Sequence, residues 1–222
     1  METQRLNTTI ASRLGVSRRH ADKLITEGLV YVNGLVANLG IRVSETDTIV
    51  VSGKTLPAEK PAVTILFHKP VGFVSSRTQQ GSAPTIYSLL PPKFHELKPA
   101  GRLDKDSSGL MLLSSDGQLI YRLTHPSLEK VKRYEVTLDK PLSEHNRALI
   151  EHGVQLDDGV SKLHLQGRDT QWEISMHEGR NRQIRRTFAA IDIRVIRLHR
   201  THLGDYKLDP NLPPGKWTVI PS

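Results

Sequence analysis

The sequence contains no cysteine, few aromatic residues and no long run of apolar residues. Without cysteine the chain can form no disulfide, and it has no thiolate to act as a nucleophile or to bind zinc or an iron–sulfur cluster. Only 4 Phe, 2 Trp and 5 Tyr occur in 222 residues, so the sequence does not indicate a broad stacking platform for single strands. No apolar run approaches the roughly 18 residues that a membrane helix needs, and the first residues lack a signal peptide's apolar region. We therefore expect a cytoplasmic protein that does not contact a membrane.

Negative charge is in deficit, because 31 Lys and Arg face 23 Asp and Glu, which gives a formal net charge of +8. A basic chain of this kind favours a polyanionic partner, and nucleic acid before a membrane surface. The length suits one large domain or two smaller ones, and an apolar content of 37% with interspersed charge is typical of a globular protein.

Residues 1–52 carry the pattern of a small independent module. Apolar residues spaced four apart over residues 6–14 predict a helix, and Ser17 is suited to cap a second one. Asn33-Gly34 between two apolar stretches predicts a hairpin with a type I′ turn, and residues 48–51 predict a further strand.

Positive charge gathers near the start of the second predicted helix, at Arg18, Arg19 and Lys23. Cations at this end of a helix oppose its dipole, which favours an anion bound nearby. The alternative interpretation is a solvated face on which Arg18 pairs with Asp22 one turn later.

Residues 53–61 have no periodicity and are rich in proline and in small or charged residues, so we interpret them as a linker. The second domain then covers residues 62–222, where uneven spacing of strands and short helices predicts an α+β fold with a mixed, mostly antiparallel sheet. The predicted strands are Val63–His68, Val71–Ser76, Leu110–Ser114, Tyr134–Leu138, Lys162–Leu165, Trp172–Ser175 and Val195–Leu198. The predicted helices are Leu119–Leu123, Ser143–Glu151 and Arg182–Ile191.

One short turn, residues 100–109, combines glycines, hydroxyls, Arg102 and acidic side chains just before the apolar run 110–113. A turn joined to a buried strand can hold a polar side chain in a fixed position, and here that side chain is Asp104. Calcium binding is a weak alternative, because position 12 of such a loop requires a glutamate and Ser115 stands there. An ordinary Asp/Ser/Gly turn is the other alternative.

The segment 180–200 holds seven Arg and a single acid. On a helix, Arg182 and Arg186 fall opposite the apolar face, whereas Arg185 lies at its border and is better placed to reach a site. The planar fork of arginine suits bidentate contact with phosphate or carboxylate, although a solvated basic face is the simpler reading of Arg182 and Arg186.

The turn Gly-Arg-Leu-Asp-x-x-Ser-x-Gly-Leu resembles the catalytic signature of RNA pseudouridine synthases of the ribosomal-RNA (RsuA/RluB) family. The N-terminal pattern Ser-Arg-Arg-x-Ala-x-x-Leu-Ile-x-x-Gly-x-Val-x-Val-Asn-Gly likewise resembles an S4 RNA-binding domain. The resemblance implies that Asp104 is the catalytic carboxylate, that Tyr134 in Lys-x-Tyr-x-Val stacks on the target base, and that Arg185 in Gly-x-x-x-Gln-Ile-Arg pairs with the Asp. We predict in addition that six basic side chains bind the RNA: Arg102, Arg182, Arg186, Arg18, Arg19 and Lys23.

The activity that the resemblance implies is the isomerisation of a uridine in ribosomal RNA to pseudouridine, by a monomer that needs no cofactor or metal. Its partner would be ribosomal RNA or a pre-ribosomal particle. His199 and His202 invite a zinc hypothesis, but they lack a third ligand at suitable spacing. Two other functions remain open: a non-catalytic ribosomal-RNA-binding or ribosome-assembly protein, and an RNA glycosidase or nuclease that uses Asp104 and Asp106.

Overall fold

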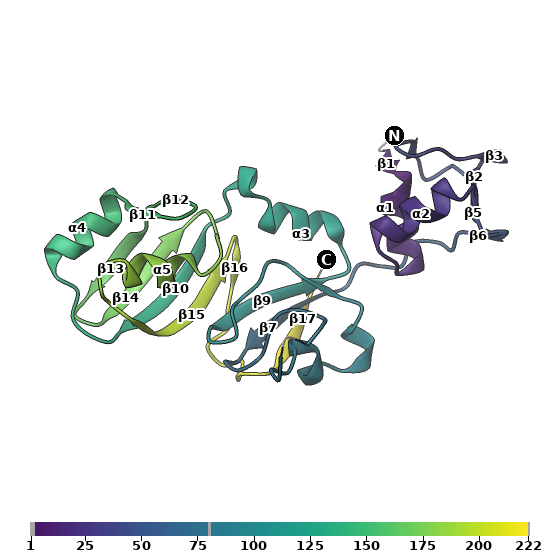
Figure 1. Cartoon of the computed structure of the whole chain (residues 1–222). Coiled ribbons are helices and arrows are strands. Elements are labelled where there is room, and N and C mark those ends of the chain that lie inside the picture. The colour runs from purple at the N-terminus through teal and green to yellow at the C-terminus, as the bar shows by residue number, and fades with distance from the viewer. Residues whose placement is uncertain (1–2, 80, 222) are drawn as a thin grey trace. The chain divides into compact units, whose positions relative to one another are not determined.

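The computed structural model describes residues 3–79 and 81–221, and the chain divides into two compact units, Met1–Ala62 and Val63–Ser222 (Figure 1). Mixed α and β elements build both units. Within the described residues, every helix is too short or too polar to cross a membrane.

The N-terminal unit consists of two helices and two small sheets. Its helices are α1 (Leu6–Leu14) and α2 (Arg18–Thr26), and its strands are β1 (Gln4–Arg5), β2 (Val30–Val32), β3 (Leu35–Val36), β4 (Arg42–Val43), β5 (Ile49–Val51) and β6 (Lys54–Thr55). As predicted, Ser17 caps α2 by accepting a hydrogen bond from the backbone N–H of His20. Asn33 and Gly34 both have positive φ, 51° and 81°, which a type I′ turn requires, so the predicted hairpin is also confirmed.

The N-terminal unit extends beyond residue 52, where the sequence predicted the linker to begin. Lys54–Thr55 pairs with β5, and Leu56 is only 7% exposed in the core of the unit. That core gathers apolar residues of both helices and the sheet, including Leu6, Ile10 and Ile25. The sequence did not predict β6, because two residues are too few to show the alternation of apolar and polar side chains that indicates a strand.

The second unit is built on one mixed sheet of nine strands. The main path runs β13-β14-β10-β15-β9-β7-β17, with β16 beside β15 and β8 beside β9. Its strands are β7 (Thr64–Lys69), β8 (Lys98–Pro99), β9 (Ser108–Ser114), β10 (Lys132–Leu138), β13 (His164–Arg168), β14 (Gln171–Met176), β15 (Val195–Leu203), β16 (Tyr206–Lys207) and β17 (Trp217–Ile220); β11 (Val154–Leu156) and β12 (Gly159–Ser161) form a separate hairpin. Only the pair β15–β9 is parallel within this described sheet, so the predicted mixed, mostly antiparallel sheet is confirmed.

Over the described residues 63–79 and 81–221, three α-helices and three 3-10 helices complete the second unit. They are α3 (Gly117–Thr124), α4 (Glu144–His152), α5 (Gln183–Ala189), and the 3-10 turns Ile86–Leu89, Pro92–Phe94 and Pro126–Leu128. In Figure 1, α5 lies over the β10–β14 part of the sheet, α4 lies at its β13 edge and α3 lies near β9. The buried run in β9 is apolar at every position because both of its faces are covered: Met111 and Leu113 join one core cluster, and Leu110 and Leu112 join another.

One predicted strand, Val71–Ser76, is wrong. Gly72 adopts a φ of +91°, and the segment pairs only through an isolated bridge between Val74 and Thr85 among the described residues. The backbone N–H of Gly72 instead bonds to the carbonyl of Lys105, so this segment supports the Asp104 turn.

Candidate active site

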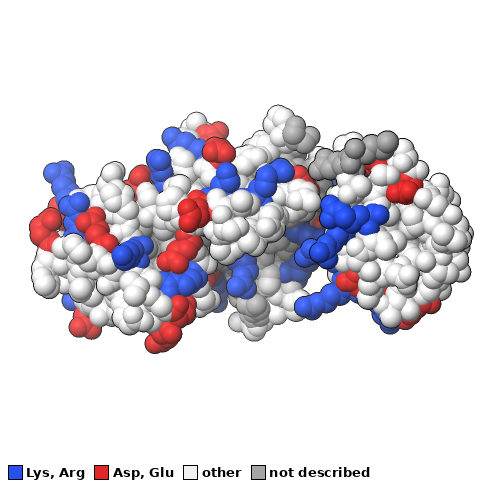
Figure 2. All heavy atoms as spheres, turned by 90° about the horizontal axis from the view of Figure 1, so that it is seen from above, with Lys and Arg blue, Asp and Glu red and all other residues white. Residues whose placement is uncertain are grey.

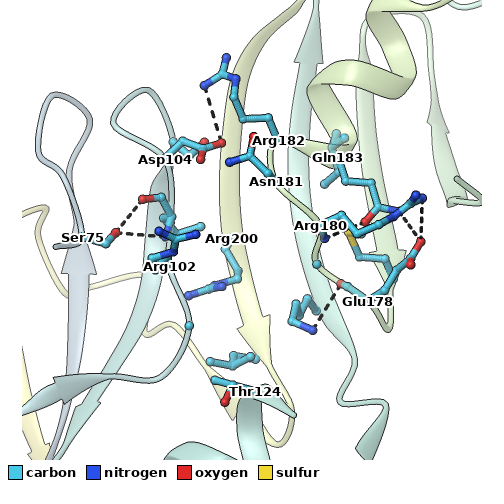
Figure 3. Close-up of a pocket in the computed structure, with 18 of the residues that line it drawn as sticks. Ser75, Arg102, Asp104, Thr124, Glu178, Arg180, Asn181, Arg182, Gln183 and Arg200 are labelled. Carbon is cyan, nitrogen blue, oxygen red and sulfur yellow. Dashed lines mark hydrogen bonds and ion pairs between the residues drawn. The ribbon is translucent and has the colours of Figure 1, made fainter. Parts of the chain in front are cut away.

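A cleft of about 610 Å³ opens in the second unit where β15 meets β9 (Figure 3). Its lining residues come from six segments, within the ranges 74–76, 100–107, 123–126, 130–134, 176–184 and 198–203. In Figure 3, Ser75 and Asp104 stand on one wall, Arg180, Asn181 and Gln183 on the other, and Arg200 projects from the strand between them. The two motifs that the sequence singled out therefore face the same space.

The backbone that carries Asp104 is fixed by buried side chains, while its carboxylate stays accessible. The Ser75 hydroxyl donates to the carbonyl of Leu103 (2.6 Å) and accepts from the Leu103 N–H (3.1 Å). The Asp104 carbonyl accepts from the backbone N–H of Ser107 (3.1 Å), and the Asp104 side chain is 31% exposed. The sequence predicted a fixed turn that presents a carboxylate, and this arrangement matches it.

Lys69, at the end of β7, is the second support of the turn. Its ammonium is fully buried and donates to the carbonyls of Pro70 (3.0 Å), Asp104 (2.9 Å) and Ser107 (2.7 Å). Burial lowers the pKa of Lys69 to about 8, although the charges of Asp104 and Asp106 act in the opposite direction. The contacts of Lys69 with the Asp104 backbone therefore give the Lys-Pro turn after β7 a structural role.

The arginine that pairs with Asp104 is Arg182, which corrects the expected pairing with Arg185. Arg182 Nη1 lies 3.8 Å from Asp104 Oδ2, and its fork binds both oxygens of Asp106 at 3.0 and 3.1 Å. Arg185 donates to the carbonyls of Val195 and Asp106 (both 2.8 Å), and its Nε lies 3.4 Å from Asp106 Oδ2. Within the described residues, no ion pair joins Arg185 to Asp104.

Two arginines therefore hold Asp106, the neighbour of the proposed catalytic carboxylate. Burial alone would raise the pKa of Asp106, but the hydrogen bonds from Arg182 and the charges of Arg185 and Arg182 outweigh it and lower the pKa. Burial also lowers the pKa of Arg185 despite the nearby carboxylates. The bridge from Asp106 to Arg182 joins the turn before β9 to the start of α5, which are opposite walls of the cleft.

The remaining predicted RNA contacts of the second unit divide into two cases. Arg102 is exposed and lines the cleft, as a substrate-binding side chain requires. Arg186 lies outside the cleft lining, where its guanidinium contacts Asp158 (2.7 Å) and the carbonyl of Asn181 (2.8 Å). The position of Arg186 therefore favours a role in fixing the start of α5 over direct contact with a ligand in the cleft.

Tyr134 lies on β10 at the cleft and is 7% exposed. Across the sheet it is paired with Arg200 of β15, a fully buried arginine that the sequence analysis missed. On its other side Arg200 is paired with Gly109, and a Cβ on Gly109 would lie 2.2 Å from the Arg200 carbonyl oxygen. Only glycine permits this approach, so Gly109 allows β15 to close the floor of the cleft.

The three predicted RNA-binding side chains of the N-terminal unit, Arg18, Arg19 and Lys23, are all exposed on α2. Asp22 accepts a hydrogen bond from Asn7 (2.8 Å) instead of pairing with Arg18, while Lys23 lies 3.6 Å from Glu27. In Figure 2, basic side chains gather on one side of this unit, and most of its remaining visible surface is uncharged.

The two histidines considered as metal ligands have other partners. His199 Nδ1 lies 2.9 Å from the Ser108 hydroxyl, and His202 Nδ1 lies 2.9 Å from that of Thr201. Across residues 3–79 and 81–221, no group of three His, Cys, Asp or Glu side chains is placed to hold a metal ion.

Comparison with known proteins matches both units. A family model for RNA pseudouridylate synthase matches residues 63–190, and a model for the S4 domain matches residues 4–49. A crystal structure of a pseudouridylate synthase superposes with a TM-score of 0.71 at 32% identity, covering 98% of this chain and 96% of the other.

Relatives matched over nearly the whole of this chain share about a third of their residues with it. The ribosomal small subunit pseudouridine synthase A of Salmonella typhimurium is 34% identical, over 97% of this chain and 96% of its own. The ribosomal large subunit pseudouridine synthase B of Vibrio vulnificus is 33% identical, over 98% and 72%. An uncharacterised RNA pseudouridine synthase of Aquifex aeolicus is 36% identical, over 97% and 92%. The resemblance seen in the sequence is thus confirmed: this chain is an isomerase of the RNA pseudouridylate synthase family, with an N-terminal S4 domain.

Proposed function

We propose that this enzyme converts specific uridines of ribosomal RNA to pseudouridine, with Asp104 as the catalytic carboxylate. The observation that carries the assignment is the Asp104 turn, whose backbone is held by Ser75 and Lys69 while its carboxylate faces the cleft. Ribosomal RNA is proposed as the substrate because the named relatives act on ribosomal subunits and the N-terminal S4 domain is a nucleic-acid-binding module.

The reaction breaks the N1–C1′ bond of uridine, turns the uracil and rejoins it through C5. The target nucleotide first leaves its stack, at a cost of a few kcal/mol, and stacking on an aromatic ring recovers about 1–3 kcal/mol. Tyr134 offers such a ring at the cleft. Asp104 then acts as the anionic nucleophile or charge partner at the glycosidic bond, as carboxylates do in glycosidases.

The surroundings of Asp106 argue against a hydrolase. A glycosidase commonly uses a second carboxylate to activate water, and Asp106 is the nearest candidate in the sequence. Both of its oxygens accept hydrogen bonds from Arg182, and its lowered pKa makes it a weak base. Retention of the detached uracil in the cleft, away from bulk water, then favours isomerisation over hydrolysis.

The test is tritium release from ribosomal RNA that carries 5-³H-uridine, offered both as naked RNA and as ribosomal particles. C5 gives up its hydrogen when it becomes the glycosidic carbon, so we expect release by the wild type and none by Asp104→Asn. RNA binding by Asp104→Asn should stay close to that of the wild type, because the substitution keeps the side-chain shape. Normal turnover by this variant would contradict the proposed role of Asp104.

Two outcomes would favour the rival functions. No release by the wild type on either substrate would favour a non-catalytic ribosomal-RNA-binding protein. Free uracil or cleaved strands in place of pseudouridine would favour a glycosidase or nuclease.

A further inference from the structure

Arg200 is a buried cation with a donor that the protein leaves unused. Its side chain is 2% exposed, and its Nε donates to the carbonyl of Leu110 (2.8 Å). Its Nη2 is also buried, yet it has no hydrogen-bond partner within residues 3–79 and 81–221. A buried donor without an acceptor destabilises the fold, and more so when it is charged, so the unpaired Nη2 requires an explanation.

The charges around Arg200 do not compensate it. No carboxylate of the described residues lies within ion-pair distance of its guanidinium, whereas the ammonium groups of Lys69 and Lys132 lie in the same region. Burial, and then the charge of Arg200, lowers the pKa of Lys132. Both lysines already donate to backbone carbonyls, Lys69 to that of Ser107 and Lys132 to that of His177. Of these three cations, Arg200 is therefore the one with a buried donor that has no partner among the described residues.

The position of Arg200 points its donor toward the proposed base-binding surface. Arg200 and Tyr134 are directly paired across β15 and β10, and both line the cleft. Side chains directly opposite in an antiparallel pair stand on the same face of the sheet, with Cβ atoms about 4.5–5.5 Å apart. A base stacked on Tyr134 therefore presents its edge, which carries two carbonyl oxygens, to the guanidinium.

We propose that Arg200 donates its free N–H to a carbonyl oxygen of the target uracil and stabilises the negative charge that the ring carries when it is detached. This inference rests on the proposed function. Cleavage of the N1–C1′ bond leaves the electron pair on the uracil, where it is shared by N1, O2 and O4. C1′ is held meanwhile as an ester of Asp104, or as a glycal whose 2′ proton Asp104 has taken. C5 then bonds to C1′, which releases the ester or regains its 2′ proton, while the C5 proton goes to solvent and N1 takes one up.

A cation buried in the cleft is effective in this role because its orientation is fixed before the reaction. Its charge acts where water is excluded, so its interaction with the developing anion is stronger than in solution. The same contact holds the detached ring in place, which isomerisation requires and hydrolysis does not.

The first experiment compares single-turnover rates of the wild type, Arg200→Met and Arg197→Met on the RNA fragment that the wild type modifies. Removal of one such donor costs about 100-fold or more in rate, so we expect a loss of that size for Arg200→Met. Arg197 is the matched control: it lies on the same strand, outside the cleft lining, with a half-exposed side chain paired to Glu135 at 3.1 Å. Arg197→Met should convert the RNA at the wild-type rate, and free uracil should appear only with Arg200→Met.

The second experiment separates contact with the base from a structural role. The target uridine is replaced by 2-thiouridine or by 4-thiouridine, because sulfur accepts hydrogen bonds more weakly than oxygen. If Arg200 contacts one of these oxygens, the corresponding thio substitution slows the wild type but has little further effect on Arg200→Met. Additive losses for both substitutions would overturn the inference.

A third variant keeps the test decisive if Arg200→Met does not fold. Arg200→Lys retains the charge but not the fork, and it enters the same cycle with both thio substrates. If the wild type is active but the losses from the Arg200 variants and from the thio substrates are additive, only this inference is overturned and the proposed function stands. Wild type that releases no tritium would overturn the proposed function.

Discussion

The two units of this enzyme use positive charge in opposite ways. In the N-terminal unit, Arg18, Arg19 and Lys23 are exposed on one helix. In the catalytic unit, Lys69 at the end of β7 and Arg200 within β15 are buried, and each donates to at least one backbone carbonyl at a fixed position. Exposed cations attract phosphates at long range and adapt to their positions, whereas buried cations act only at a fixed point.

Exposed and buried cations are useful for different tasks. An exposed ion pair contributes about 0–1 kcal/mol and weakens with salt, so many exposed charges are needed for firm binding. A buried charge is costly unless carbonyls or a ligand satisfy it, and in return it keeps its direction. Binding of RNA and rearrangement of one nucleotide therefore place different demands on arginine and lysine within one chain.

We expect the largest loss of activity from removal of Lys69, the buried cation that supports the catalytic turn. Lys69→Met leaves the carbonyls of Pro70, Asp104 and Ser107 without their donor, so the turn shifts. A displacement of about 1 Å in a catalytic group can cost 100-fold, and we expect a loss of that order in kcat with RNA affinity nearly unchanged. Single-turnover rates and filter binding measure the two quantities, with the exposed Lys140→Met as control. Unchanged kcat would mean that the turn does not depend on Lys69.

The same lysine gives the stability of the enzyme a pH dependence. The pKa of Lys69 is about 8 in the folded protein, whereas its ordinary value, which we take for the unfolded chain, is 10.5. Between these two pH values the unfolded chain therefore binds more protons than the folded protein. The free energy of unfolding therefore rises with pH across this window, by up to roughly 3 kcal/mol from this group. Denaturant unfolding at pH 7.5 and pH 10 should show a larger gain for the wild type than for Lys69→Met. Equal gains would mean that Lys69 does not titrate in this range.

An intermediate effect is expected from the bridge across the cleft. Asp106→Asn weakens the bidentate contact with Arg182 and the ion pair with Arg185, while Asp104 remains in place. We expect about a tenfold loss of kcat, because Arg182 loses its anchor near Asp104 but keeps its charge. Stability should change by less than about 1 kcal/mol, since Asp106 is half exposed. Complete loss of turnover would instead favour the alternative in which Asp106 is a second catalytic carboxylate.

The smallest effect on turnover is expected from the exposed cations. Arg18→Ala/Arg19→Ala should weaken RNA binding and leave kcat at saturating RNA unchanged. Each lost phosphate contact reduces the slope of log affinity against log salt by about 0.7–0.9, so the double variant should lower it by up to about 1.8. Lys140→Ala/Arg168→Ala removes the same charge from exposed sites outside the cleft and is the control. Equal slopes for the two double variants would show that net charge alone matters.

Local features were the part of the fold that the sequence predicted well. The Asn33-Gly34 turn and the Ser17 cap depend on neighbouring residues alone, so their patterns are visible in a short window. The same holds for the Asp104 turn, whose glycine and hydroxyl content precedes a continuously apolar strand. The predicted strand at residues 71–76 was wrong because an extended segment without a partner can have the same apolar pattern as a paired strand.

The partners of charged side chains could not be predicted in this way. Helical periodicity placed Arg185 nearest the site, but Arg182 precedes the helix with a φ of +47° and reaches Asp104 from there. Arg200 follows an expected strand that ended at residue 198, and its burial depends on β9 and β10, which come from distant parts of the chain. A lone arginine in a strand gives no local sign that its partners lie elsewhere.

The parallel seam between β9 and β15 also governs when the enzyme becomes active during its synthesis. In the described part of the chain only two residue pairs join these strands, Ser108 with His199 and Gly109 with Arg200, and about ninety residues separate them in sequence. Asp104 and Tyr134 leave the ribosome long before β15 does. The nascent enzyme therefore carries its carboxylate and its aromatic ring on separate, unfinished pieces, and it acquires a floor to its cleft only after β15 has been made and has paired with β9 and β10.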